Sequence, residues 1–559
     1  MTTPVLLDAH GHANLTNSGQ VSLTDSEKSI PKDEEAQGTY VGTATATELS
    51  FGSDDETLRT KFYEPPDSYE SKHRWDPKAT WTEEEEKKLD RKLDWRIMFF
   101  ACVCFFSLCL DRSNIGSALS DGFLADIGCT TADYNNGQTI FLVAFLLSEL
   151  PSQLISKKIG SDRWIPIQMM VWSLVTLGNM GIKDRGSYFA LRALLGIFEG
   201  GFIADTVLYL SYYYTTVQLT TRLGYFWISL TVASIAGSLL AAGILELRHH
   251  THLAGWRWLF MIEGLLTFLI GVFAWFYLPP GPTQTAGGPF NVRGKGWFTE
   301  REEVIIVNRV LRDDPTKSDM HNRQGISLSQ FKDSIIDYDL WPCYAIGIVF
   351  YLAQSTVGAY FTLTLKSLGY STFHTNLLVI PSSIVMIINI FWLTALSKKL
   401  KERFLVSTIG AFWGIILFAV LVAIPSSTNK WGKWALLSLI VSTPYYHPIT
   451  VSTVSGNSGS VRMRTVSLAV YNMMAQVGGI AAAHVYNPSD APYYPKGNKV
   501  LLGVVILSLA VLLFSKAYYV LRNRYRAKIW DSWSPEEKHH YLQTTTDKGN
   551  KRLDFRFVH

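Results

Sequence analysis

Cysteine is scarce in this chain, and its few copies are not spaced as ligands. The 559 residues include 5 Cys. Three of them, Cys102, Cys104 and Cys109, lie within one apolar stretch, where cysteine acts as a small hydrophobic residue. The other two are far apart in the sequence, so neither a disulfide framework nor a zinc site is predicted. We therefore expect no metal and no cofactor.

Charge is also sparse, at 18% of residues against 48% hydrophobic. The charged residues gather at the two ends, in one central stretch and in short loops, whereas the segments between them are long and apolar. This pattern is typical of a polytopic membrane protein in contact with lipid. The net charge of +4 is small, so no nucleic-acid partner is expected. No basic patch followed by an apolar core opens the chain, and no cleaved signal peptide is predicted.

Both ends of the chain are polar. Residues 1–80 are rich in Ser, Thr, Gly, Asp and Glu, bury little apolar surface and are predicted to form a disordered cytosolic tail. Residues 81–95 follow as a charged helix whose cap is Thr82. A second polar tail, residues 522–559, closes the sequence.

Twelve apolar segments are predicted to be membrane-spanning helices, because an isolated span must satisfy its own backbone groups in lipid. A polar stretch, residues 279–340, divides them into six-helix halves, 96–278 and 341–521, and carries an amphipathic surface helix at 297–312. The fold class is therefore an all-α membrane protein with two halves. The segments are 96–117, 136–156, 164–182, 187–212, 223–246, 256–278, 341–364, 376–396, 404–424, 433–453, 465–485 and 499–521.

The basic residues between the spans set the orientation. Loops on the cytosolic side carry an excess of Lys and Arg, and here the loops after spans 2, 8 and 10 and the C-terminal tail are basic. The loop after span 1 has Asp but no Lys or Arg. Both termini and the central loop are therefore predicted to be cytosolic. The loop after span 5, which contains Arg248, departs from this rule.

The fourth span carries charge in an apolar helix. Arg192 and Glu199 are seven residues apart and so lie on one face of a helix. Unpaired charge in hydrocarbon costs several kcal/mol, so such residues usually face a wet cavity or each other. Other charges within the spans also fall in the first half, whereas the second half offers neutral polar groups. The first-half residues are Asp111, Arg112, Glu149, Arg192, Glu199, Asp205 and Glu263.

Several motifs, taken together and in order, resemble the fungal allantoate permease family, in the anion:cation symporter branch of the major facilitator superfamily. The resemblance covers residues 85–530. This chain departs from the family pattern in the loop 156–163, which matches the superfamily's G-x3-D-R signature only in part, and at Ala204-Asp205, where Pro-Gly is common. The motifs are Leu110-Asp-Arg-Ser-Asn-Ile-Gly-Ser-Ala, R-x3-G-x2-E-G-G from Arg192 to Gly201, Gly255-Trp-Arg-Trp-Leu-Phe-Met-Ile-Glu-Gly, Trp297-Phe-Thr-Glu-Arg, Arg309-Val-Leu-Arg-Asp-Asp-Pro, Thr375-Asn-Leu-Leu and Asp490-Ala-Pro-Tyr-Tyr-Pro-Lys-Gly-Asn.

The resemblance implies the major facilitator fold and a site near the bilayer midplane. In bacterial and animal members of that branch, an Asp-Arg or an Arg in span 1 and an Arg-x6-Glu in span 4 form the coupling and anion site. The matching residues here are Asp111, Arg112, Arg192 and Glu199. Arginine suits carboxylate or sulfonate, and the protonation of Glu199 and Asp111 would then depend on whether an anion occupies the arginines. The alternative is a buried ion-pair network that only holds helices together.

Other polar residues have weaker assignments. Asp205 and Glu149 are predicted to be gate residues, or Asp205 a packing contact with a base on the cytosolic side. Glu263 is expected to pair with Arg257, and His447 to be a satisfied core histidine. The predicted substrate contacts besides the arginines, each of which has an interhelical hydrogen bond as its alternative, are Asn114, Gln354, Tyr360, Asn472 and Gln476.

The sequence thus predicts a monomeric, proton-coupled symporter that imports a small organic or sulfur-containing anion across the plasma membrane. The family carries anions such as allantoate, nicotinate, pantothenate, biotin and sulfonates, generally with protons. An alternative is a nutrient-sensing receptor that has the same fold without net transport. No cluster of His, Cys or acids has triad or ligand geometry, so an enzyme is not expected.

Overall fold

The computed structural model describes residues 64, 65, 67, 69–250, 252–313, 328–425, 427–458, 461–491, 493–545, 547 and 549–559. Within these residues all regular secondary structure is helical. The predicted N-terminal tail lies outside them up to residue 63. In the described part of the chain, nine helical segments are long and apolar enough to cross a membrane. These helices confirm the predicted all-α membrane fold, while the count of twelve spans stays a prediction.

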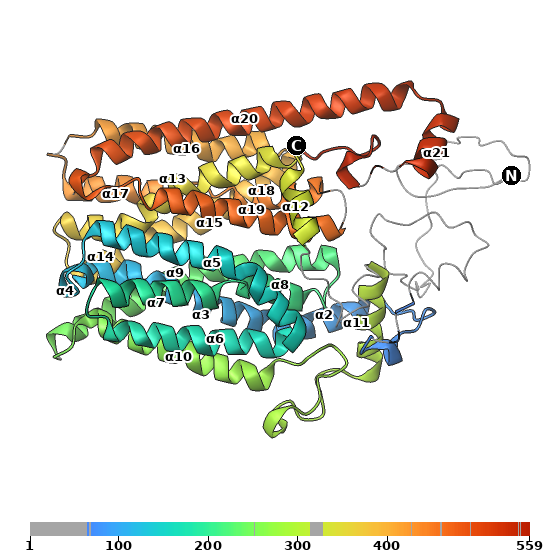
Figure 1. Cartoon of the computed structure of the whole chain (residues 1–559), viewed down its shortest axis with the longest axis horizontal. Coiled ribbons are helices and arrows are strands. Elements are labelled where there is room, and N and C mark those ends of the chain that lie inside the picture. Colours follow the sequence, from blue (N-terminus) through green and yellow to red (C-terminus); the bar gives the residue numbers. More distant parts are fainter. Residues whose placement is uncertain are drawn as a thin grey trace, which may run out of the picture.

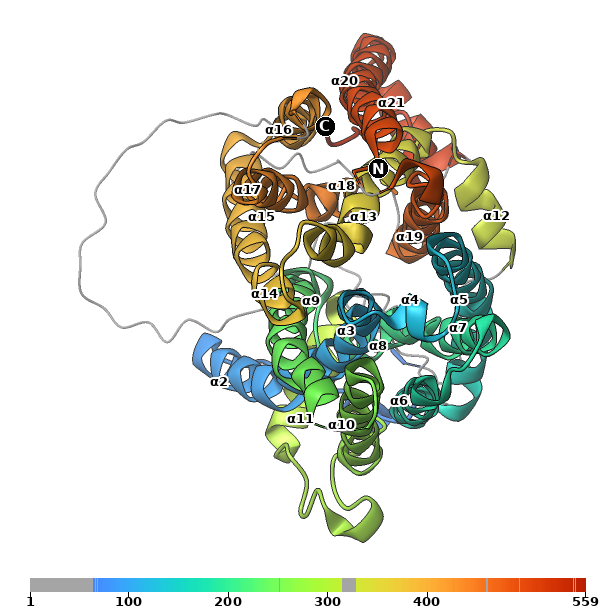
Figure 2. The ribbon, with the colours of Figure 1, turned by 90° about the vertical axis from the view of Figure 1, so that its left-hand side faces the viewer.

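The helices form two groups that lie side by side along a common axis (Figures 1 and 2). One end of the bundle carries the short helix α4 (Phe123–Asp126) and is called the loop end; the opposite end, where α2 and α21 lie, is called the tail end. The first half contains α3 (Phe99–Ser120), α5 (Thr131–Ile159), α6 (Ser161–Gly178), α7 (Arg185–Glu199), α8 (Phe202–Leu210), α9 (Thr216–Ile244) and α10 (Gly255–Tyr277). The second half contains α13 (Trp341–Ser367), α14 (Thr372–Leu377), α15 (Ile380–Leu400), α16 (Phe404–Ala423), α17 (Lys430–Val441), α18 (His447–Asn457), α19 (Val461–Ala482) and α20 (Pro495–Ser532).

Three predicted spans are divided in the structure. The predicted helix 187–212 breaks at Gly200-Gly201 into α7 and α8, because Gly201 has φ 86°, a left-handed conformation that favours glycine. The span predicted at 376–396 begins in the short helix α14, which ends before α15 starts. The span predicted at 433–453 divides into α17 and α18 before His447, where Pro448 occupies the first turn.

The two halves are hydrogen-bonded to each other at the loop end. Among the described residues, six hydrogen bonds join them, and all six lie there. Asn135 on α5 donates to the Tyr486 carbonyl at 3.0 Å and accepts from Tyr360 of α13. Ser120 at the end of α3 accepts from Thr372 and Asn376. No ion pair joins the halves in the described part of the chain, so neutral groups alone hold the loop end closed.

Charged segments pack on the tail end of the first half. Helix α2 (Glu83–Leu93) begins with the predicted capping box at Thr82. Helix α11 (Glu300–Asp313) places Arg309 2.7 Å from Asp90 of α2 and 3.0 Å from the Tyr213 carbonyl. The prediction of disorder through residue 80 is wrong at its end. Tyr69 is buried, and Arg74 bonds Glu303 at 2.8 Å, because α11 offers the tail an apolar and acidic face.

The C-terminal segment is docked on the tail end of the second half. Helix α12 (Leu328–Ile336) leads to two buried acids, Asp337 and Asp339, just before α13. Lys551 lies 2.7 Å from Asp339, and Arg522 of α20 lies 3.2 Å from the same carboxylate. Phe557 is buried against Tyr519. These contacts tie the final residues to the start of α13.

Replacing Asp339 with Asn should lower the thermal stability of the second half. Its side chain is fully buried beside Lys551, Arg522 and Arg526, and removal of one partner from a buried ion-pair cluster costs about 3–5 kcal/mol. Lys551→Met should cost less, because 34% of that side chain is exposed. Thermal unfolding in detergent would measure both, and an equal loss for the two variants would contradict this ranking.

The same cluster predicts acid sensitivity. Burial raises the pKa of Asp339, whereas its interactions with Lys551, Tyr518 and Arg522 lower it by a larger amount. The resulting pKa of Asp339 lies below its ordinary value. A depressed folded-state pKa adds stability at neutral pH, which is lost as the pH falls through that pKa. The stability difference between wild type and Asp339→Asn should therefore shrink only in acid. A difference that stays constant down to acid pH would argue against the ion pairs.

Candidate functional site

Glycines bring α7 against α5 and so set the position of the charged stripe. A Cβ at Gly196 would lie 2.4 Å from the Phe141 carbonyl oxygen, and one at Gly200 would lie 1.8 Å from Ser148 Oγ. Small residues four apart let two helices approach closely in a membrane. The R-x3-G-x2-E-G-G motif therefore combines a packing face on α5 with a charged face, on which Arg192 and Glu199 lie.

The charged face of α7 meets α3. Arg112 Nε donates to Glu199 Oε2 at 2.6 Å. Glu199 is 2% exposed and Arg112 28% exposed as side chains, so the pair is buried on one side and open on the other. The structure thus brings together a span-1 arginine and a span-4 glutamate that are 87 residues apart in sequence.

The second arginine has no carboxylate partner of its own in the described residues. Arg192 Nη2 donates to Gln138 Oε1 of α5 at 2.6 Å. The Phe141 ring is close to both arginines, with its centroid 4.5 Å from Arg192 Cζ and 5.5 Å from Arg112 Cζ. Phe145 also faces Arg112, at 4.7 Å. Aromatic faces attract guanidinium groups and keep them oriented.

This cluster has one more positive than negative charge. It holds two guanidinium groups and the single carboxylate of Glu199, and Arg112 Nη2 and Arg192 Nε are buried without a hydrogen-bond partner. Buried donors of this kind are normally satisfied, so the two free N–H groups are oriented to receive an acceptor. An anion with two or more oxygens fits both the charge and the donors.

The second half contributes neutral groups opposite the cluster. Tyr351 of α13 interacts electrostatically with Arg112. A Cβ at Gly479 of α19 would lie 3.0 Å from the Tyr351 ring and 3.2 Å from Leu142 of α5. The predicted contacts Asn472 and Gln476 share that face of α19, because they precede Gly479 by seven and three residues. They are therefore placed on the boundary between the halves.

Asp111 lies on another face of α3. It is adjacent to Arg112 in sequence and so lies about 100° around the helix. Its carboxylate accepts from Trp172 Nε1 of α6 at 3.1 Å, inside the first half. Asn114 is likewise buried there, at 2% exposure. The structure thus places these two predicted site residues behind the arginine cluster rather than in it.

Comparison with known proteins identifies the family. The model of the Major Facilitator Superfamily matches residues 101–483. The chain belongs to this superfamily. A protein of Saccharomyces cerevisiae named as an uncharacterized transporter is 47% identical over 499 residues, which cover 89% of this chain and 92% of the relative. A major facilitator-type transporter of Emericella nidulans is 26% identical over 454 residues, 80% of this chain and 88% of the relative.

Solved structures share the major facilitator fold. A bacterial homolog of the human lysosomal transporter Spinster, in an inward-facing and occupied conformation, matches with TM-score 0.54 and 16% identity over 78% of this chain and 98% of that one. The xylose transporter XylE of E. coli matches with TM-score 0.55 and 12% identity over 75% and 97% of the two chains. This chain is thus a membrane transporter of the major facilitator type; the allantoate permease branch stays a prediction.

The predicted gate acids of this facilitator lie within its first half. Asp205 is fully buried at the start of α8 and accepts from Ser152 Oγ of α5 at 3.0 Å. Glu149 is also buried. It precedes Ser152 by one turn on α5 and interacts electrostatically with Asp205. The expected basic partner of Asp205 is a serine instead. The break at Gly200-Gly201 also separates Asp205 from Glu199, because α7 ends before it.

Three other expectations change. Glu263 does not pair with Arg257, whose guanidinium donates to the Met180 and Ile182 carbonyls. Gln354 lines a small cavity enclosed by α13, α16, α17 and α20, all in the second half. Tyr360 bonds Asn135 at the closed loop end. Neither Gln354 nor Tyr360 lies with the arginines in this conformation.

His447 is a hydrogen-bonded core residue, as predicted. Its Nδ1 lies 3.0 Å from the Tyr471 hydroxyl. Its ring also meets Trp227 of α9 edge-on, with centroids 6.0 Å apart. It therefore marks a contact between the two halves.

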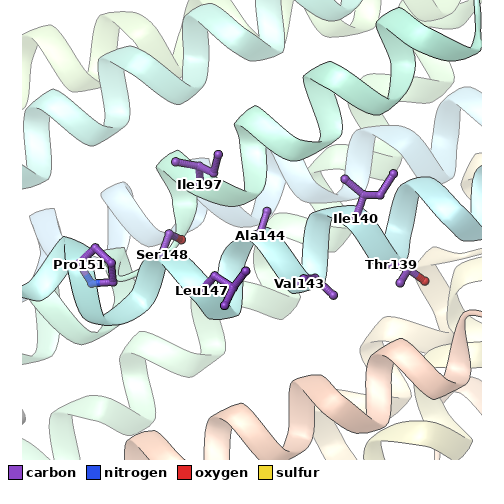
Figure 3. Close-up of a pocket in the computed structure, with 8 residues that line it drawn as sticks. All are labelled: Thr139, Ile140, Val143, Ala144, Leu147, Ser148, Pro151 and Ile197. Carbon is purple, nitrogen blue, oxygen red and sulfur yellow. The ribbon is translucent and has the colours of Figure 1, made fainter. Parts of the chain in front are cut away.

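An apolar pocket of about 590 Å³ lies on another face of α5 and α7 (Figure 3). Leu147 and Ile197, which line it, are 67% and 46% exposed. No charged residue lines the pocket, so it has nothing to bind an anion and is not the site. Its lining residues are Thr139, Ile140, Val143, Ala144, Leu147, Ser148, Pro151 and Ile197.

The sequence reading missed the second layer around the arginines. Gln138, Phe141 and Phe145 stand at i, i+3 and i+7 of α5, one helical face. An amide and two aromatic rings on that face of an otherwise apolar span were the available signal. Their role could be inferred only from the packing of α5 on α7. That packing depends on the glycines of α7.

Gly200→Ala should destabilise the first half, because its Cβ would overlap Ser148 Oγ and lie 2.7 Å from the Phe145 carbonyl. Overpacking of this kind costs about 1–3 kcal/mol. Gly503→Ala on α20 is the matched control, since nothing lies within 4 Å of its Cβ position. Thermal unfolding in detergent checks both. Equal stability of the two variants would show that α7 does not need this close approach.

Proposed function

We propose that this facilitator is a symporter that takes up a small organic or sulfur-containing anion together with a proton. The observation that carries the proposal is the excess positive charge of the cluster. It has two arginines for one carboxylate, which pairs with Arg112, and among the described residues each arginine has a buried donor without a partner. A carboxylate or sulfonate would complete the hydrogen bonds of both guanidinium groups. Phe141 keeps the two groups oriented without neutralising them.

The proton would couple to the anion through Glu199. In the present conformation Arg112 binds Glu199 at 2.6 Å, and an incoming anion competes for the same guanidinium. When the anion takes Arg112, Glu199 loses its positive partner in a buried place, and protonation becomes favourable. Each ligand then favours the other, as linkage requires. Arg192 remains beside Gln138 to hold the second side of the anion.

Alternating access would proceed by rocking of the halves. The loop end is closed by the six hydrogen bonds between halves, so the anion would reach the arginines from the tail end in this state. The excess of basic residues in the tail-end loops assigns that end to the cytosol by the positive-inside rule. We infer a plasma-membrane location, a monomer and no enzymatic step from the same predictions.

Arg248 fits this orientation although its loop lies at the opposite end. It pairs with Asp121 and Asp126 there. A paired arginine adds little to the charge of its loop. The departure from the positive-inside rule at span 5 is thereby accounted for.

Replacing Glu199 with Gln should abolish proton-driven accumulation and spare anion exchange. The amide keeps the size of the side chain but cannot exchange a proton. A panel of carboxylates, sulfonates and sulfur oxyanions would first be screened by thermal shift. The anion that stabilises the protein most would then be labelled and used as the substrate in proteoliposomes. Uptake driven by an inward proton gradient and counterflow without one are then compared.

Glu536→Gln, an exposed change in α21, is the control for this experiment. Undiminished gradient-driven accumulation by Glu199→Gln would contradict a role of Glu199 in proton coupling. Binding without any flux in the wild-type protein would instead favour the receptor alternative.

Arg192→Lys should weaken anion binding roughly tenfold or more, because lysine lacks the planar fork and loses a charge-assisted hydrogen bond of about 1.5–3 kcal/mol. Arg185→Lys is the matched control on the same helix, since Arg185 is 61% exposed and pairs with Asp133. The measurement is the Kd of the labelled anion in detergent. Unchanged affinity would favour a purely structural ion-pair network.

A further inference from the structure

A second cluster of polar groups is enclosed between α3, α6 and α10, behind the arginine cluster. Glu263 on α10 is fully buried, and neither of its carboxyl oxygens has a hydrogen-bond partner among the described residues. Asp111 on α3 has Trp172 on one oxygen and no partner on Oδ1. Two carboxyl groups therefore stand in the apolar interior of the first half with three unused oxygens.

The neighbours of the two acids are arranged reciprocally. Thr267 follows Glu263 by one turn on α10 and lies beside the Asp111 carboxyl. Asn114 follows Asp111 by one turn on α3 and lies beside the Glu263 carboxyl. Thr267 Oγ1 and Asn114 Nδ2 are also buried without a hydrogen-bond partner. Five unpartnered polar atoms on four side chains thus gather in one place.

No positive group among the described residues balances these acids. The nearby charges are Glu199, whose charge acts on Asp111, and Arg112, which is paired with Glu199. Arg257, on the same helix as Glu263, is bound to backbone carbonyls. An ionised carboxylate without a partner is so costly in an apolar interior that the group takes up a proton instead. Two such groups side by side cannot both ionise.

We propose that Asp111 and Glu263 together hold a bound proton, at a site separate from the Arg112–Glu199 pair. The proton sits on Glu263, whose two oxygens have no other partner in the described part of the chain, and it is donated in a hydrogen bond to Asp111, whose other oxygen accepts from Trp172. The free Asn114 N–H and the Thr267 hydroxyl donate to the remaining oxygens. A donor N–H among the free atoms suits a protonated carboxyl pair better than a metal ion, which takes oxygen ligands. Trp172 fixes the Asp111 side of the pair.

This site gives the first half two protonation positions separated by one helix. Asp111 and Arg112 are consecutive residues, so any tilt of α3 that moves Arg112 away from Glu199 also moves Asp111 relative to Glu263. The use of this proton in transport rests on the function proposed above. Its presence in the resting protein does not.

Infrared spectroscopy of the purified protein at neutral pH tests the proposal without a substrate. A protonated carboxyl has a C=O stretching band that is separate from the carboxylate bands and shifts in D2O. The difference spectrum of wild type minus Glu263→Gln should show loss of an acid band and no matching loss of carboxylate. Glu536→Gln, which removes an exposed acid, should show the opposite pattern.

Asp111→Asn is the second variant, since it should shift the acid band of the remaining Glu263 and keeps the test open if Glu263→Gln does not fold. Loss of carboxylate absorption in Glu263→Gln, or an unshifted band in Asp111→Asn, would overturn the shared proton. Spectra in sodium chloride and choline chloride are compared as well. An acid band that disappears on addition of sodium would identify the ligand as a metal cation and overturn the proposal.

Proton-to-anion stoichiometry in proteoliposomes separates this idea from the proposed function. If the second proton is transported, Glu263→Gln should reduce the number of protons per anion by one and shift the reversal potential, while gradient-driven uptake persists. Glu199→Gln should abolish that uptake. An altered infrared band with unchanged stoichiometry would confine the proton to a resident role and overturn its part in coupling.

Discussion

A charge in an apolar interior must have a partner, and this constraint organises the first half of the molecule. Arg112 uses Glu199, Arg192 uses Gln138 and the Phe141 face, and Asp205 uses Ser152. Each of these contacts crosses between helices, so each one also fixes how two helices pack. The helices are thereby held in register by the groups proposed to act on ions. Structure and function in this half depend on the same contacts.

The positions of the charges were predictable from the sequence to a large extent. The seven-residue spacing of Arg192 and Glu199 needs only helical geometry, and α7 contains both. The apolar runs likewise indicated the long helices of the two halves, whereas α8 and α14 were not foreseen as separate helices. The break after Glu199 was not foreseen, although Gly200-Gly201 stood in the motif, because a continuous helix with glycines and a broken one have the same hydropathy. The break places Asp205 on a separate helix, α8.

Side-chain directions were less predictable because they depend on which helices are neighbours. Asp111 and Arg112 were assigned to one site, yet consecutive residues of a helix lie about 100° apart, and α3 packs on different helices at the two angles. Gln354 and Tyr360 were selected as polar groups in apolar spans. One lies in the interior of the second half and the other at the loop end. Polarity identified residues with a buried role, but not which role.

The hydrogen bonds that close the loop end also set an energy scale. They join neutral groups, and each contributes a net stabilisation of about 0.5–1.5 kcal/mol. Their sum is comparable to the roughly 8 kcal/mol released when a ligand binds with micromolar affinity. The hydrogen bonds at the loop end are therefore weak enough for a solute to shift the carrier between its two orientations if the solute binds one of them better by a comparable few kcal/mol.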